Sequence, residues 1–123
     1  MENTEKTVLI VDDDPYILDI LQRHLRTKGL RVLSTTDPET AYSLAEKEIP
    51  NLIISDIAMP ALDGFALLKA LRANKVTCEI KLALLTVSDR IGDVEKGFAS
   101  GAQAYLLKPF DWETAWPKIQ ALL

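Results

Sequence analysis

The chain has 123 residues, which is enough for one domain with a single buried core. Its net charge of −4 argues against non-specific binding to nucleic acid or to an anionic membrane. There is no apolar run long enough to cross a bilayer and no secretion signal at the start, and the one cysteine, Cys78, cannot form an internal disulfide. These features favour a cytoplasmic protein.

The first strand and helix are marked by clear sequence signals. Residues 1–6 are polar and predict a frayed tail, and the apolar run Thr7–Val11 predicts a strand buried on both faces. Asp14 followed by proline predicts the start of an amphipathic helix, which Gly29 ends. His24 lies in this helix beside charged residues. Because no second histidine is present, we expect His24 to face solvent rather than bind a ligand.

The middle of the chain repeats the alternation of strand and helix. Leu30–Thr35 predicts a strand near the sheet edge, and Asp37 with the proline after it predicts the next helix. The apolar run 52–54 predicts a buried strand, and a single carboxylate, Asp56, follows where the run ends. Taken alone, such an aspartate is more often a helix cap or turn residue than a functional group. Gly64 then opens a third helix.

The last third of the chain adds two strands and two helices. Leu82–Leu85 and Ala104–Leu107 are apolar runs that predict strands, and between them the segment after Asp89 predicts a weak, mobile helix because it contains two glycines. Asp111 predicts the start of the last helix, in which two tryptophans one turn apart favour core packing. Pro117 lies inside that helix and predicts a kink or a break.

Strand and helix patterns therefore alternate five times with short connections. This order predicts one α/β domain over residues 1–123, with a doubly wound parallel sheet and helices on both faces. The carboxyl ends of parallel strands share one edge of a sheet. Polar residues at four predicted strand ends should therefore meet there: Asp12 and Asp13, Asp56, Thr86, and Lys108.

The chemistry of these residues predicts what the site holds. Carboxylates packed together repel one another unless a cation neutralises them, and oxygen ligands without histidine or cysteine suit Mg²⁺ better than a Ca²⁺ cage. A hydroxyl and an ammonium group facing the same point suit phosphoryl oxygens. The predicted reaction is attack by a carboxylate on a phosphoryl group to give an acyl phosphate.

These motifs, together with DIAMPALDG around Asp56, with Tyr105 and with Lys108-Pro109, resemble the receiver domain of bacterial two-component response regulators across nearly the whole chain. The resemblance implies a flavodoxin-like sheet with strand order 2-1-3-4-5. It also implies a phosphorylation switch rather than an enzyme that turns over small molecules. The implied partners are a histidine kinase or histidine phosphotransfer protein, a downstream effector domain or protein and, as an option, a phosphorylation-dependent homodimer. Direct binding to nucleic acid or a membrane is not implied.

The resemblance also implies a role for each site residue. Asp56 is the phosphoacceptor, and Asp13, Asp56 and the backbone carbonyl of Ala58 bind Mg²⁺, for which Mn²⁺ can substitute, while Asp12 acts largely through water. Thr86 and Lys108 contact the phosphoryl group. The remaining implied features are the Tyr105 side chain, which changes rotamer with Thr86, and a cis bond before Pro109.

Several residues depart from the commonest pattern of this family. Val87 replaces a small residue, and Ala58 and Ser88 offer no carboxylate or amide to position a hydrolytic water, which leaves the phosphoryl lifetime open. Two other functions stay as alternatives. One is a phosphohydrolase like the haloacid dehalogenases, and the other is a pseudo-receiver that binds a partner without phosphorylation. A flavin-binding flavodoxin is disfavoured because carboxylates would repel the cofactor phosphate.

Overall fold

The computed structural model describes residues 5–56, 64–86, 99, 101–108 and 111–123. The elements in them are β1 (Thr7–Val11), α1 (Pro15–Arg26), β2 (Arg31–Thr35), α2 (Pro38–Glu48), β3 (Leu52–Asp56), α3 (Gly64–Ala73), β4 (Lys81–Thr86), β5 (Ala104–Leu107) and α5 (Trp112–Leu122). The weak helix expected after Asp89 lies outside the described residues.

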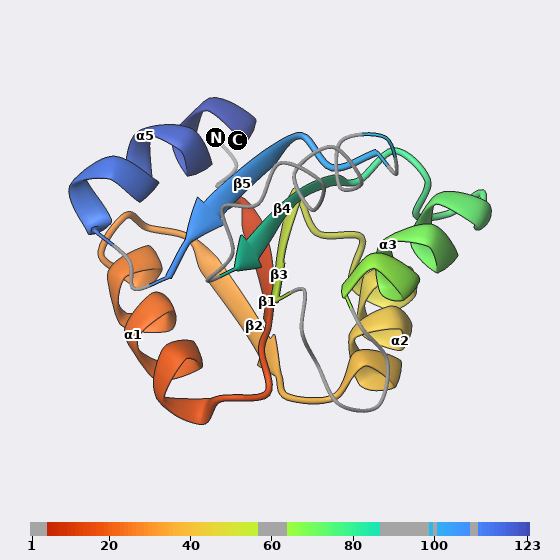
Figure 1. Ribbon diagram of the computed structural model, residues 1–123, viewed down its shortest axis with the longest axis horizontal. Coiled ribbons are helices and arrows are strands. Elements are labelled where there is room, and N and C mark those ends of the chain that lie inside the picture. Colours follow the sequence, from red (N-terminus) through yellow and green to blue (C-terminus); the bar gives the residue numbers. More distant parts are fainter. Residues whose placement is uncertain (1–4, 57–63, 87–98, 100, 109–110) are drawn as a thin grey trace.

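The five strands form one parallel sheet in the order β2-β1-β3-β4-β5. The predicted strand order is therefore confirmed, and β2 lies at an edge as its weaker apolar pattern indicated. Helices α1 and α5 cover one face of the sheet and α2 and α3 cover the other (Figure 1). This arrangement is the doubly wound α/β fold that alternating strand and helix patterns predict.

Each face of the sheet has its own hydrophobic core. In β1, Leu9 and Val11 pack towards α2 and α3, whereas Val8 and Ile10 pack towards α1 and α5. Successive side chains of a strand point to opposite faces, so a strand that is covered on both sides is apolar at most positions. All five residues of β1 are buried, which explains the unbroken apolar run in the sequence.

Three helices begin at the aspartates that the sequence indicated. Asp14 accepts a hydrogen bond from the backbone N–H of Tyr16, and Asp37 and Asp111 accept equivalent bonds at the starts of α2 and α5. Such bonds satisfy backbone donors that the first helical turn leaves unpaired.

Helix α5 differs from its prediction at Pro117. The helix is continuous from Trp112 to Leu122 with Pro117 inside it, so the predicted break is wrong, while the alternative of a kink stays a prediction. Proline removes the N–H that would pair with the carbonyl of Glu113 four residues earlier. Both residues are exposed, so water has access to that carbonyl and the helix continues.

The environment of His24 also differs from its prediction. The His24 ring stacks on the Trp112 ring at a centroid distance of 4.5 Å, and Trp112 stacks on Trp116 at 5.6 Å. Lys28 Nζ lies 5.1 Å from the Trp116 ring centre. His24 is therefore half-buried between α1 and α5 instead of facing solvent. The two tryptophans pack against the core, as predicted.

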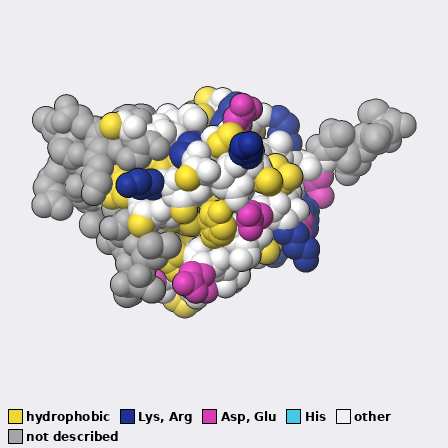
Figure 2. All heavy atoms as spheres, turned by 90° about the vertical axis from the view of Figure 1, so that its right-hand side faces the viewer, with side chains coloured by type: hydrophobic (Ala, Val, Ile, Leu, Met, Phe, Trp, Pro, Cys, Tyr) yellow, Lys and Arg dark blue, Asp and Glu magenta, His cyan; other side chains and the backbone are white. Residues whose placement is uncertain are grey.

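The described residues on the side that carries α2 and α3 include both acidic and basic side chains. Figure 2 shows apolar side chains there among scattered acidic and basic ones. Of the helices that the structure describes, none has the length and hydropathy needed to span a membrane.

Candidate functional site

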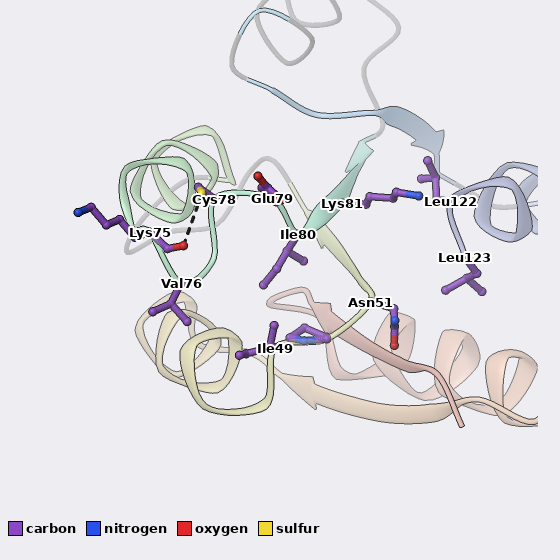
Figure 3. Close-up of a pocket in the computed structure, with 11 residues that line it drawn as sticks. Ile49, Asn51, Lys75, Val76, Cys78, Glu79, Ile80, Lys81, Leu122 and Leu123 are labelled. Carbon is purple, nitrogen blue, oxygen red and sulfur yellow. Dashed lines mark hydrogen bonds between the residues drawn. The ribbon is translucent and has the colours of Figure 1, made fainter. Parts of the chain in front are cut away.

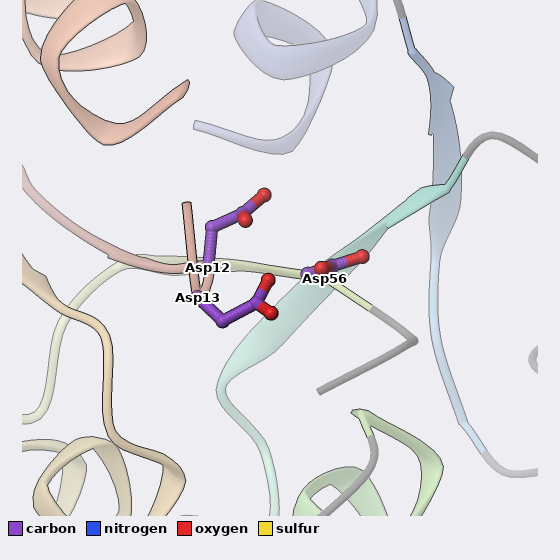
Figure 4. Close-up of side chains that lie close together, drawn as sticks. All are labelled: Asp12, Asp13 and Asp56. Carbon is purple, nitrogen blue, oxygen red and sulfur yellow. The ribbon is translucent and has the colours of Figure 1, made fainter. Parts of the chain in front are cut away.

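Three carboxylates gather where β1 and β3 end. Asp12 and Asp13 directly follow β1, and Asp56 is the last residue of β3. One oxygen of each lies within 4.8 Å of the others, and Figure 4 shows the three side chains close together. Asp12 is fully buried and Asp56 is 5% exposed, whereas Asp13 is open to solvent. The site is therefore closed to solvent at Asp12 and Asp56 and open to solvent at Asp13.

Lys108 lies between the two buried carboxylates. Its Nζ is 2.7 Å from Asp12 Oδ2 and 3.4 Å from Asp56 Oδ2. The shorter contact is a buried ion pair. Burial by itself would lower the pKa of Lys108, but the contacts with Asp12 and Asp56 outweigh it and raise that pKa. The ammonium group is therefore held in its charged form.

The Asp12 carboxyl responds differently to the same surroundings. Burial raises its pKa, and this effect exceeds the opposing influence of Lys108 and of the backbone N–H of Asp14, which donates to Asp12 Oδ1 at 2.9 Å. The nearby Asp13 raises the pKa of Asp12 further. One lysine thus compensates this cluster of carboxylates incompletely, and the site favours a further cation.

Thr86 and Tyr105 come from the two strands beyond Asp56. Thr86 is the last residue of β4 and is 5% exposed, and its carbonyl accepts a hydrogen bond from the Lys108 N–H at 2.8 Å. Tyr105 lies in β5 with its side chain buried in the core on the side of α2 and α3. This hydrogen bond holds the Lys108 backbone at the end of β4, and the Lys108 side chain extends from there to the carboxylates.

Two supporting contacts were not predicted from the sequence. Asp14, interpreted as a helix cap alone, also orients Asp12 through its backbone N–H. Ser55 is fully buried, and its Oγ donates to the carbonyl of Asp56 at 3.2 Å. A serine inside a strand buried on both faces is a sequence signal for such a contact, because a buried hydroxyl needs a partner.

Other residues of the predicted site lie outside the described part of the structure. These are Ala58, Val87, Ser88 and Pro109. Their predicted roles, including the cis bond before Pro109, stay predictions.

The described residues fit a hard divalent cation. Their donors are three carboxylates, with neither histidine nor cysteine among them, and Asp13 leaves one side open to water. Oxygen ligands with room for water match the preference of Mg²⁺. Three carboxylates and one ammonium group leave a negative net charge, which also favours binding of a cation.

Comparison with known proteins places this geometry in a family. The family model described as "Response regulator receiver domain" matches residues 8–120. The chain is 39% identical over 116 residues to the DNA-binding dual master transcriptional regulator RpaA of Synechocystis, covering 94% of the chain and 48% of that protein. It is 36% identical over 118 residues to the alkaline phosphatase synthesis regulatory protein PhoP of Bacillus subtilis, covering 96% and 48%. The chain thus spans about half the length of these relatives.

Solved structures agree with the family match. The chemotaxis protein CheY4 of Vibrio cholerae superimposes with a TM-score of 0.92 at 32% identity, covering 98% of this chain and all of that one. The receiver domain of a sensor histidine kinase of Pseudomonas aeruginosa gives a TM-score of 0.87 at 28% identity, covering 97% and 98%. In that protein a magnesium ion is coordinated in the active-site cleft.

Proposed function

The chain belongs to the receiver domains of two-component response regulators, and from this premise we propose that Asp56 accepts a phosphoryl group from a phosphorylated histidine. The donor is a histidine kinase or a histidine phosphotransfer protein. Phosphorylation then changes a surface that an effector domain or protein recognises. The observation that carries the proposal is the position of Asp56 beside Asp12, Asp13 and Lys108.

The proposed transfer is a nucleophilic substitution at phosphorus. A carboxylate oxygen of Asp56 forms a bond to phosphorus as the bond between phosphorus and the donor imidazole nitrogen breaks, and the imidazole leaves with the electron pair. The product is an acyl phosphate on Asp56. Asp56 suits this role because its backbone is fixed in β3, between β1 and β4.

A divalent cation is proposed to neutralise the site during transfer. Asp13 and Asp56 are its proposed direct ligands, with the carbonyl of Ala58, while Asp12 acts through water. When bound, Mg²⁺ supplies positive charge beside the phosphoryl oxygens, and Mn²⁺ is a proposed substitute. The gathered carboxylates and the incomplete compensation by Lys108 support this assignment.

Lys108 is proposed to exchange partners on phosphorylation. Its Nζ already lies 3.4 Å from an Asp56 oxygen, so a phosphoryl group attached to Asp56 comes within reach of the same ammonium group. A charge-assisted contact with phosphoryl oxygen is stronger than a neutral hydrogen bond. The phosphoryl group on Asp56 therefore favours movement of the Lys108 ammonium group away from Asp12 and towards the phosphoryl oxygens.

Thr86 and Tyr105 are the proposed switch residues. The Thr86 hydroxyl donates to the phosphoryl group, and Tyr105 changes rotamer as Thr86 moves. The phosphoryl group favours one of two arrangements because it contacts Thr86 in that arrangement alone. The output surface in this proposal is formed by the weak fourth helix predicted after Asp89, by β5 and by α5.

Chemical phosphorylation tests this proposal. Incubation with acetyl phosphate and Mg²⁺ should add one phosphoryl group to the wild-type chain by intact mass, while chelation of Mg²⁺ should slow the reaction strongly. The Asp56→Asn variant should stay unmodified. A wild-type chain without added mass would reject the proposal and favour a pseudo-receiver, and equal labelling of Asp56→Asn would place the chemistry elsewhere.

A further inference from the structure

A hollow of about 570 Å³ lies at the end of the sheet opposite the carboxylates. Asn51, which precedes β3, lines it, whereas Asp56 ends β3 on the far side. Figure 3 shows its wall formed by residues after α2, residues between α3 and β4, and the end of α5. Small-molecule sites in proteins commonly have volumes of about 300–1,000 Å³. The hollow is therefore large enough for an organic ligand.

Ile49 gives the wall an unusual apolar side chain. It is the one non-glycine residue with positive φ (φ 45°, ψ 64°) in the described part of the chain, and it is 56% exposed. A β-branched residue is strained in this left-handed conformation, and glycine would remove both the strain and the exposed apolar surface. The left-handed backbone at Ile49 ends α2, with its N–H donating to Ala45 O, and the isoleucine at this position adds exposed apolar surface to the hollow.

Other apolar groups extend the same wall. Val76 is 51% exposed, and Ile80 lies on the facing side of the hollow from Ile49 (Figure 3). Among the described residues, four large hydrophobic side chains are strongly exposed, and two of these four, Ile49 and Val76, line this hollow. The concentration of exposed apolar surface at one place fits an apolar ligand body.

The charged side chains of the hollow are mainly basic. Lys75 and Lys81 line it together with one acidic residue, Glu79. Figure 3 shows Lys81 extending towards Leu122, whereas Lys75 reaches outward at the rim. Two ammonium groups against one side-chain carboxylate leave a positive side-chain balance in a chain whose net charge is −4, and Lys6 pairs with the Leu123 oxygen at the edge of the hollow. Lys81 is the better placed anchor for an anionic group.

Helix ends oppose this balance. The carboxyl ends of α2, α3 and α5 face the hollow, and each helix end carries about half a negative charge. Some carbonyls at these ends are already hydrogen-bonded, because Ala45 O accepts from the Ile49 N–H at 3.0 Å and Leu71 O accepts from Thr77 Oγ1 at 2.6 Å. The Arg72 guanidinium also brings a full positive charge behind the wall. Counted together, the two lysines and Arg72 carry more positive charge than Glu79 and the three helix ends carry negative charge, so the hollow favours an anion.

We propose that this hollow binds a small amphipathic organic anion. Its apolar body lies against Ile49 and Val76, and its acidic group lies near Lys81. Binding requires neither Asp56 nor its phosphorylation, so this site and the phosphorylation site stand or fall separately.

Three small probes that differ in charge or in chain length test the ligand class. Octanoate carries both the apolar body and the negative charge, octylammonium reverses the charge, and acetate lacks the body. In ¹H–¹⁵N spectra of the 123-residue chain, octanoate below its aggregation concentration should shift the amides of Ile49, Val76 and Lys81 in a saturable manner. Octylammonium and acetate should bind at least about tenfold more weakly. Equal or tighter binding of octylammonium, or no saturable shift with octanoate, would overturn the proposal.

Two variants separate binding from folding. Ile49→Gly should weaken octanoate binding about tenfold, because it removes the apolar contact with the ligand. The same variant should raise the urea midpoint of unfolding, because glycine removes the backbone strain. Lys81→Glu should transfer the preference from octanoate to octylammonium. Lys69→Glu makes an equal charge change on the exposed side of α3 and should alter neither the affinity for octanoate nor the affinity for octylammonium. Unchanged octanoate affinity in both Ile49→Gly and Lys81→Glu would refute the site.

Discussion

Asp12 shows how a single residue sets the electrostatic character of the site. Its carboxyl is fully buried, and burial raises its pKa in spite of the ion pair with Lys108. Desolvation of a buried charge can exceed the attraction of its partner. The ionised Asp12 is therefore expected to cost stability in the metal-free protein, which suits a residue that serves binding rather than folding.

The Asp12→Asn variant should accordingly be more stable than the wild type at neutral pH without Mg²⁺. Below pH 3.8, the ordinary value for this carboxyl, Asp12 is protonated in both the folded and unfolded states and the gain should vanish. As the pH rises above 3.8, the unfolded chain loses its proton first, because the folded pKa is raised. The penalty on the wild type therefore grows until the pH passes the folded pKa. Urea midpoints across this range measure the gain.

Asp19→Asn provides the matched control for this charge change. Asp19 pairs with Arg23 on the exposed surface of α1, where ion pairs contribute about 0–1 kcal/mol. Its replacement should change the midpoint little. A loss of stability in Asp12→Asn at neutral pH would show that the ion pair with Lys108 outweighs desolvation and would contradict this assignment.

Gly101 is a second position where one residue has a defined cost of replacement. Its φ is +103°, and an added Cβ would lie 2.8 Å from Arg72 Nε. Arg72 cannot move away freely, because it donates to the carbonyls of Gly101 and Ile80 at 2.7 Å each. Gly101→Ala should therefore destabilise the fold by about 2–4 kcal/mol, from backbone strain and weakened charge-assisted hydrogen bonds.

Gly29→Ala separates strain from the steric clash. Gly29 also has positive φ (+79°), but nothing lies within 4 Å of an added Cβ. Strain alone predicts a loss of roughly 1–2 kcal/mol for this variant. Denaturant unfolding compares the two, and a cost for Gly101→Ala no larger than that for Gly29→Ala would exclude the Arg72 contact as a cause.

At the scale of elements, the ring stack joins α1 to α5. Helix α1 follows Asp12 and Asp13, and α5 begins four residues after Lys108, so a short connection joins each helix to the acidic site. The stack of His24, in the last turn of α1, on Trp112, the first residue of α5, holds the two helices against one another. Stacked aromatic pairs contribute about 0.5–1.5 kcal/mol beyond their buried area.

A double-mutant cycle on His24→Ala and Trp112→Leu should therefore give a coupling of about 0.5–1.5 kcal/mol in unfolding free energy. The same Trp112→Leu change combined with Asp19→Ala should be additive, because Asp19 pairs with Arg23 on the exposed face of α1. If the unfolding free energies of His24→Ala and Trp112→Leu were additive, or if the control cycle showed equal coupling, the proposed stabilisation by the ring stack would be contradicted.

Element boundaries were predictable where local contacts decide them. Asp14, Asp37 and Asp111 each bond to an N–H two residues ahead, so the cap is visible in a short stretch of sequence. The left-handed Ile49 was not predictable. Just beyond it, Asn51 is held to Thr7 by two hydrogen bonds of 2.8 Å, a contact between residues 44 positions apart. The His24 stack, which joins residues 88 positions apart by their numbering, is equally invisible in sequence.

For the whole molecule, topology explains why the site could be located before the fold was known. Asp12, Asp56, Thr86 and Lys108 lie far apart in the chain, but each stands at the carboxyl end of a strand in one parallel sheet. Such ends share an edge, so residue order and strand pattern were sufficient to predict the gathering of side chains. The contact of Lys108 with both Asp12 and Asp56 depends on side-chain packing, and sequence pattern alone does not give such distances.

The location of the phosphoryl group tests the central claim most directly. Borohydride reduces an acyl phosphate to an alcohol and so converts a phosphorylated aspartate into homoserine, which peptide mass spectrometry locates. After treatment with acetyl phosphate and Mg²⁺, homoserine should be found at position 56 and at no other aspartate. Homoserine at position 12 or 13, or none in a chain that has gained phosphoryl mass, would contradict the assignment of Asp56 as the acceptor.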